Sequence, residues 1–205
     1  MRILFVADGR SPIALNWIAY FVDQGYEVHL VSTFPCEPAL QFASLNCVPV
    51  AFSQMKGKGT RGKGAGELGG GVLLEALGVR VRTALRQGFG VLTIPKAARR
   101  LRRIVAAIQP DLIHAMRVPY EGMLAAQALR ESPGLPLLVS AWGNDFTLHA
   151  VSNPWMASAT RRTLARANAL HVDCQRDLRL AHRWGYQEDK PENEQCSQSR
   201  GFHPK

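Results

Sequence analysis

A repeated alternation of short apolar segments with segments of helical periodicity constrains the fold of this chain more than any other feature. Residues 3–7 are apolar without alternation, which is typical of a strand that is buried on both faces. A helix is predicted over 12–24, because Ser11 can cap its first turn, Pro12 suits its start and Gly25 can end it.

The same alternation continues toward the C-terminus. Further strands are predicted at 28–31, 46–52, 111–116, 137–142 and 169–172. Further helices are predicted between Pro95 and Pro110 and at 120–130, 154–167 and 175–184. Strands and helices that alternate over short connections indicate an α/β fold: a doubly wound, mostly parallel, Rossmann-like sheet with helices on both faces.

Sheets of this kind bind ligands at the carboxyl ends of their strands, so the loops that follow Ala7, Met116, Trp142 and Cys174 are the candidates for a site. The first loop comes directly before a helix, whose N-terminal N–H groups favour an anion. Its candidate residues are Asp8, Gly9, Arg10 and Ser11. A purely structural role stays open, in which Ser11 caps the helix and Gly9 turns the chain.

The loops after the fourth and fifth strands add two further groups. His114 lies near the end of one strand, with Arg117 and Glu121 just beyond it. His114 can equally be a hydrogen-bonded core residue, and Glu121 can favour the start of the next helix through its charge. The turn after the next strand holds Trp142, Gly143, Asn144 and Asp145, either as an ordinary turn or as a cleft wall whose carboxylate accepts hydrogen bonds from hydroxyls.

Several chemistries lack their sequence motifs. The chain has no Gly-x-Gly-x-x-Gly fingerprint, no Walker loop, no Gly-x-Ser-x-Gly elbow and no His-x-x-x-His pair. We therefore predict neither a metal site nor a bound cofactor. Cys36, Cys47, Cys174 and Cys196 are scattered without a Cys-x-x-Cys, which predicts reduced thiols in a cytoplasmic protein.

A positive charge distinguishes the chain, with 25 Lys and Arg against 16 Asp and Glu and a formal net charge of +9. This excess favours an anionic partner, although no recognition motif supports nucleic acid. Residues 55–71 are glycine-rich and basic and are predicted to form a mobile loop. No signal peptide and no apolar run of about 18 residues is present, so no membrane span is predicted.

Four segments together resemble the N-terminal half of a glycosyltransferase family 4 enzyme with GT-B architecture. They are MRILFVADGRSPIALNWIAYFVDQGYEVHLVS, PDLIHAMRVPYEGMLAA, SAWGNDF and ARANALHVDCQRDLRLAHRWGY, and the resemblance covers about 1–186. It implies two Rossmann-like domains that face each other across a cleft. The first mainly holds the acceptor and the second a nucleotide-sugar donor, with transfer that retains configuration and needs no metal.

The resemblance also implies roles for the candidate residues. The loop 8–11 would face the transferred sugar and the donor phosphates, whereas Asn16, His114, Arg117, Glu121 and the turn 142–145 would line the acceptor side. Many relatives carry His-Gly-x-Asp at this turn. Trp142 stands at the position of that His, so the role of the His does not transfer to this chain, and no catalytic residue is assigned.

Relatives that glycosylate lipid acceptors often dock on anionic membranes, which implies a peripheral location at the inner face of the membrane and a sugar or lipid-linked acceptor. Each basic residue near such a surface contributes about 1 kcal/mol. The candidate membrane residues are Lys56, Lys58, Arg61, Lys63, Arg99, Arg100 and Arg103. The alternative is that these basic residues only face solvent, on one side of a helix and in a loop.

Residues 187–205 contain only two hydrophobic residues and are predicted to be a disordered tail behind one domain at 1–186. A family 4 enzyme would continue here into its donor domain. We therefore expect either a truncated product with a frameshifted tail or a separately encoded donor subunit, and negligible transfer by this chain alone. The alternatives are a non-enzymatic sugar- or membrane-binding module and an unrelated Rossmann-type nucleotide enzyme.

Overall fold

A six-stranded parallel sheet organises the computed structural model, which describes residues 1–50 and 90–188. The strand order is β3-β2-β1-β4-β5-β6 and every neighbouring pair is parallel. The strands are β1 (Arg2–Ala7), β2 (Glu27–Ser32), β3 (Ser44–Cys47), β4 (Leu112–Ala115), β5 (Leu137–Ala141) and β6 (Ala169–Val172). This confirms the predicted α/β, Rossmann-like fold.

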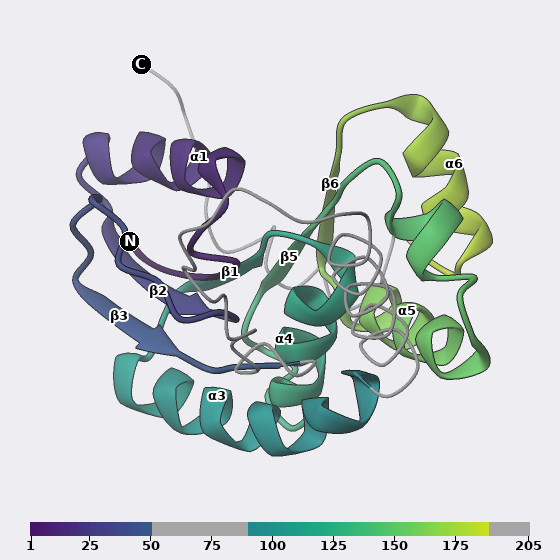
Figure 1. Cartoon of the computed structure of the whole chain (residues 1–205), viewed down its shortest axis with the longest axis horizontal. Helices are drawn as coiled ribbons and strands as arrows, with labels where there is room; N and C mark the ends of the chain where they lie inside the picture. The colour runs from purple at the N-terminus through teal and green to yellow at the C-terminus, as the bar shows by residue number, and fades with distance from the viewer. Residues whose placement is uncertain (51–89, 189–205) are drawn as a thin grey trace, which may run out of the picture.

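Helices cover the sheet from both sides (Figure 1). α1 (Pro12–Asp23) lies on one side, and α3 (Ile94–Ile108), α4 (Met123–Ala128) and α5 (Pro154–Arg166) lie on the other. α6 (Gln175–Arg183) follows β6. Three short turns, η1 (Gly90–Thr93), η2 (Val118–Gly122) and η3 (Asp145–His149), precede α3, α4 and α5.

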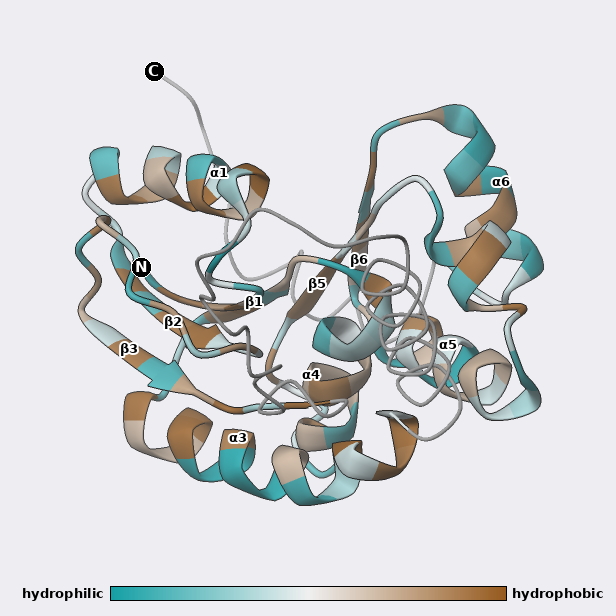
Figure 2. Ribbon diagram, in the orientation of Figure 1, coloured by the Kyte–Doolittle hydropathy of each residue, from teal (hydrophilic) through white to brown (hydrophobic). Residues whose placement is uncertain are grey.

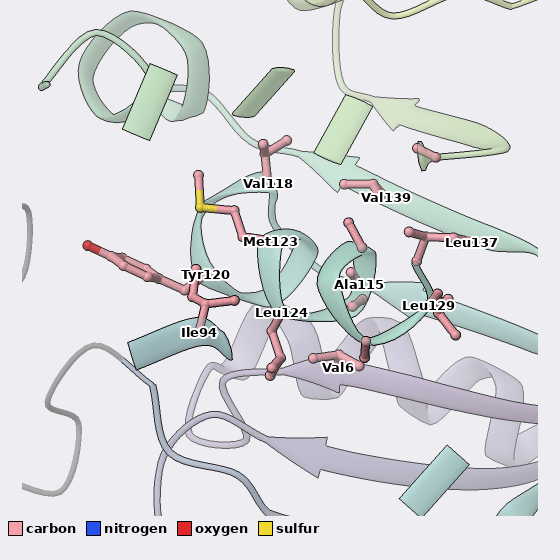
Figure 3. Close-up of a cluster of buried hydrophobic side chains, with 14 of the residues drawn as sticks. Val6, Ile94, Ala115, Val118, Tyr120, Met123, Leu124, Leu129, Leu137 and Val139 are labelled. Atoms are coloured by element: carbon pink, nitrogen blue, oxygen red, sulfur yellow. The ribbon is translucent and has the colours of Figure 1, made fainter. Parts of the chain in front are cut away.

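Strand β1 explains why its sequence is apolar without alternation. Ile3 and Phe5 pack toward α1, whereas Leu4 and Val6 pack into the larger cluster under α3 and α4. All four side chains are fully buried. Hydrophobic residues run through the central strands in Figure 2, and Figure 3 shows Val6 within the larger cluster.

The residues predicted to cap, end and pack the helices do so in α1 and α3. The Ser11 hydroxyl accepts a hydrogen bond from the Ala14 N–H, and Gly25 follows α1 with a φ of 75°. In α3, Leu101, Ile104, Val105 and Ile108 face the core, as their spacing predicted.

Two predicted elements are wrong in their boundaries. The third strand was predicted at 46–52, but β3 is Ser44–Cys47. Val48 still donates its N–H to the Ser32 carbonyl, after which Pro49 has no N–H with which to continue the ladder. Val48 and Val50 are buried beyond the strand, so their alternation reflects burial without strand pairing.

The helix predicted at 120–130 begins later, because α4 starts at Met123. Pro119 has a ψ of 131° and Tyr120 a φ of 65°, so neither residue is helical. A positive φ is strained for a tyrosine. The predicted loop at 55–71 and residues 189–205 of the predicted tail lie outside the described residues.

Gly122, at the start of α4, packs too closely for a side chain. A Cβ there would lie 2.8 Å from the Arg117 carbonyl oxygen, 3.0 Å from Thr163 Cγ2 and 3.3 Å from Val139 Cγ1. Its own N–H donates to the same Arg117 carbonyl at 2.8 Å. Glycine at this position therefore lets the loop after β4 close against β5 and α5.

We predict that Gly122→Ala lowers the free energy of unfolding by about 1–3 kcal/mol, because the added methyl group overpacks this contact. Gly134→Ala is the matched control, since a Cβ at Gly134 meets no atom within 4 Å. Urea unfolding of both variants measures the difference. Equal stability of the two variants would contradict the packing account.

Candidate functional site

The candidate site lies at the carboxyl edge of the sheet, where the strand order reverses between β1 and β4. From β1 the chain proceeds to β2 on one side, whereas β4 and β5 extend on the other. The Met116 N–H donates to the Val6 carbonyl and the Thr33 N–H to the Ala7 carbonyl, both at 2.9 Å. The loops after β1, β2 and β4 therefore lie next to one another, as ligand-binding loops do in open α/β sheets.

The loop after β1 is fixed by contacts with the end of β2 and with the loop that follows it. The Gly9 N–H donates to Ser32 Oγ at 3.0 Å. A Cβ at Gly9 would collide with Cys36 Sγ and would lie 2.9 Å from Ser32 Oγ, so only glycine fits between these loops. The close approach brings Asp8 and Arg10 to the edge of the sheet.

Arg10 and Asp8 form a two-pronged ion pair on this loop. Arg10 Nε and Nη2 donate to Asp8 Oδ1 and Oδ2, both at 2.9 Å. The guanidinium also lies over the Phe34 ring, 3.6 Å from its centroid. The side chains keep 53% and 29% of their exposure, so the pair can still reach a ligand.

A second pair, Arg117 with Asp145, links the loop after β4 to the loop after β5. Arg117 Nη2 and Nε donate to Asp145 Oδ1 at 2.7 and 3.2 Å. The backbone N–H groups of Val118 and Trp142 donate to Oδ2, each at 3.1 Å. Both oxygens of this fully buried carboxylate are thus engaged by the protein, while Arg117 remains 38% exposed.

The charge of Arg117 is maintained by its neighbours. Burial disfavours the cation, but the charge and hydrogen bonds of Asp145, together with the charges of Glu121 and Asp8, raise the pKa of Arg117. Arg117 therefore stays charged and interacts electrostatically with three carboxylates.

Glu121 is a buried carboxylate whose charge acts on Arg117. The Thr33 hydroxyl donates to Glu121 Oε1 at 2.6 Å, and Glu121 is only 4% exposed. It directly follows Tyr120, whose strained backbone turns the chain before α4. Strained residues of this kind are held in place by surrounding contacts and often occur at functional sites.

His114 is buried one residue before the end of β4. Its side chain lies on the α1 side of β4, 1% exposed, with Nε2 2.9 Å from Ser140 Oγ and the Phe5 and Trp17 rings nearby. Burial, with a smaller effect of the His171 charge, lowers the pKa of His114 from 6.5 to about 3. His114 is thus neutral and belongs to the core in this structure.

The remaining candidates fall in different places. Gly143 and Asn144 are exposed at the turn after β5, where Gly143 has a φ of 36° and its carbonyl accepts from Arg176 Nη2 at 3.2 Å. Trp142 is half-buried, and Asn16 is exposed on α1. The roles of these residues toward a ligand stay predictions.

The basic residues lie apart from the site. Arg99, Arg100 and Arg103 are exposed on α3, across the sheet from α1 (Figure 1). Lys56, Lys58, Arg61 and Lys63 lie outside the described residues. Within 1–50 and 90–188, no helix combines the length and the apolar character needed to cross a membrane. Docking on an anionic membrane stays a prediction.

The site also contains residues that the sequence reasoning missed. Ser32 is the last residue of β2, and Thr33 and Phe34 follow it. These three residues contact Gly9, Glu121 and Arg10, respectively. The rule that ligand-binding loops follow strands could have found them, since β2 neighbours β1. Among the described residues, no three His, Cys, Asp or Glu side chains gather to hold a metal ion.

We predict that Asp145→Asn lowers the free energy of unfolding by roughly 2–3 kcal/mol, because it leaves the half-buried Arg117 without its counter-charge. The matched control is Glu131→Gln, which breaks the exposed pair with Arg102 at 2.9 Å and should cost less than about 1 kcal/mol. Chemical denaturation compares them. A loss at Glu131 as large as that at Asp145 would refute the role of this buried pair.

The buried His114 makes the stability of the fold depend on pH. Above pH 6.5 His114 is neutral in both the folded and the unfolded chain. Below it the unfolded chain binds a proton that the folded chain excludes down to about pH 3, so stability falls as pH falls. Wild type should lose about 2 kcal/mol more than His114→Gln between pH 7 and pH 5. Urea unfolding at both values measures this, and parallel losses would exclude His114 as the cause.

Comparison with known proteins identifies the family of this chain. A family model described as glycosyl transferase 4-like domain matches residues 9–192. No curated protein matches the sequence significantly. The match confirms the resemblance found in the four sequence segments. Because it spans most of the 205 residues, the chain belongs to the glycosyl transferase 4-like domain family.

Proposed function

We propose that this chain forms the acceptor-side half of a glycosyltransferase that uses a nucleotide-sugar donor and retains the configuration of the transferred sugar. The observation that carries the proposal is a cluster of charged side chains. The cluster lies where the strand order of the sheet reverses between β1 and β4, in a domain of the glycosyl transferase 4-like family. The cluster consists of Asp8, Arg10, Arg117, Glu121 and Asp145. The nucleotide-sugar would be a co-substrate, and no cofactor is needed.

The charge balance of this cluster supports the acceptor side. Its three carboxylates and two arginines give a formal charge of −1, although the whole chain carries +9. Both arginines already bind carboxylates, so a nucleotide diphosphate would compete with Asp8 and Asp145 for them. A neutral sugar would not compete, since its hydroxyls can donate to carboxylates and accept from arginine N–H groups.

Residues outside this cluster would stabilise the leaving group. Transfer from a nucleotide-sugar releases a diphosphate, whose developing charge needs positioned donors in the transition state. We propose that a donor-side half supplies these donors, either as another part of the same protein or as a separate polypeptide. The loop with Asp8 and Arg10 would then face the transferred sugar, and a lipid-linked acceptor would place the arginines of α3 near an anionic membrane.

Glycosyl transfer tests this proposal directly. We predict negligible transfer from sugar-labelled nucleotide-sugars to neutral alkyl glycosides by residues 1–205 alone, and transfer once the donor-side half is added. In the combined system, Asp8→Asn should lower kcat/KM by roughly 10- to 100-fold, because one hydrogen bond to a charged group is lost. Asp23→Asn is the control, since Asp23 is exposed at the far end of α1.

Robust transfer by this chain alone would refute the need for a donor-side half. Equal effects of Asp8→Asn and Asp23→Asn would refute the placement of the site. Calorimetry adds a third outcome: tight binding of a nucleoside diphosphate or a dinucleotide to this chain alone would favour the unrelated nucleotide enzyme.

A further inference from the structure

Cys36, in the segment between β2 and β3, contacts the loop of the candidate site. Its Sγ atom would collide with a Cβ at Gly9, and Ser32 Oγ would lie 2.9 Å from that same Cβ. The Gly9 N–H also donates to Ser32 Oγ at 3.0 Å. The Cys36 thiol is therefore a close neighbour of both Gly9 and Ser32.

Cys47, the last residue of β3, is the second neighbour of Ser32. The two strands are parallel, and their register places Cys47 beside Ser32. Neighbouring strands lie about 4.8 Å apart, and residues in register point to the same face of the sheet. Leu30 belongs to the hydrophobic cluster on the α1 side, so Ser32 and Cys47 also point to that side.

The segment that joins β2 to β3 lies on this same face of the sheet. Leu40 and Phe42 pack against the cluster on the α1 side. The Ala43 N–H donates to the Val28 carbonyl at 2.8 Å, which leads the chain back into the sheet at β3. Cys36 and Cys47 are thus carried by one short loop and the strand that it enters, on one side of the sheet.

Electrostatic effects agree with this placement of the two sulfur atoms. Burial, and more weakly the charge of Cys36, raises the pKa of Cys47. The hydrogen bond and the charge of Asp8, and more weakly the charge of Cys36, raise the pKa of Arg10 against the opposite effect of burial. The Cys36 sulfur therefore lies within electrostatic range of both Cys47 and the Arg10 guanidinium.

Both thiols are free and can be reached from solvent. Cys36 is half-buried and Cys47 is exposed. A disulfide requires Cα atoms within about 7 Å of each other. Any adjustment that the bond requires can be made by the loop that carries Cys36, so the pairing of β2 with β3 does not have to open.

We propose that Cys36 and Cys47 form a reversible disulfide site beside the loop 8–11, oxidised by a low-molecular-weight disulfide such as glutathione disulfide. One cysteine thiolate attacks the small disulfide, which forms a mixed disulfide and releases one glutathione thiol. The other cysteine then displaces the remaining glutathione. In total, two protein thiols are oxidised to one disulfide, and one glutathione disulfide is reduced to two thiols. This chemistry does not depend on the proposed transferase function.

The bond would act on the candidate site through the segment that holds Phe34. The Arg10 guanidinium lies over the Phe34 ring, and Cys36 follows two residues later. A covalent link from Cys36 to β3 therefore restrains the surface against which the site loop packs, and a reductant releases it. Disulfides in reducing compartments are typically transient and redox-sensing, which fits a pair of free thiols.

Mass spectrometry of the full chain tests the site. The reduced protein is freed of reductant and equilibrated with glutathione disulfide, and the remaining thiols are alkylated. Chymotrypsin can cleave after Phe42, which lies between the two cysteines, so the disulfide appears as two joined peptides in the unreduced digest. We expect this link to be the main disulfide of the folded chain and to disappear with dithiothreitol. A chain in which Cys36 and Cys47 remain thiols, or carry only glutathione, would overturn the proposal.

Single substitutions check the exchange mechanism. Cys36→Ser should raise the amount of Cys47 that carries glutathione about tenfold over wild type, because no neighbouring thiol remains to displace it. Cys174→Ser is the matched control, since Cys174 is an exposed cysteine at the start of α6, and it should leave the Cys36–Cys47 link unchanged. Circular dichroism checks that each variant is folded. Loss of the link in Cys174→Ser would overturn the proposal.

Discussion

Burial of strand β1 on both faces is the constraint on which the rest of the structure depends. Its side chains point alternately into the cluster under α1 and the cluster under α3 and α4. Since β1 pairs with β2 on one edge and β4 on the other, it lies at the point where the strand order reverses. The loop that follows β1 is thereby placed between two other strand ends, which gives the domain one edge suited to a ligand.

The polar groups at that edge are held by one another. Asp145 joins the loops after β4 and β5 through four hydrogen bonds. Ser32, at the end of β2, binds Gly9, and Thr33, directly after β2, binds Glu121. Because these carboxylates and hydroxyls are already satisfied, the edge is ordered before any ligand arrives. Its charges are nearly balanced, in contrast with the basic outer surface of α3. We propose that the first surface suits neutral hydroxyls and the second suits anions.

Helix α1 connects this edge with the other unusual surface. Its N-terminus is capped by Ser11 at the end of the site loop, and its outer face carries Ile13, Trp17 and Tyr20. Trp17 also approaches the rings of His114 and His171 on the sheet.

The sequence by itself determined the fold class, because strand and helix periodicities and capping residues are local properties. The apolar run at 3–7 and the spacing of Leu101, Ile104, Val105 and Ile108 led to the correct elements. The sequence also placed the loop 8–11 and Arg117 at one edge, since parallel strands end together. It could not show that Asp145 binds Arg117 rather than facing solvent, or that His114 points toward α1. Which side of a strand a residue faces, and which distant loop it meets, depends on register and on sheet order. Those were decided only when tertiary packing joined β4 to β1 and β5.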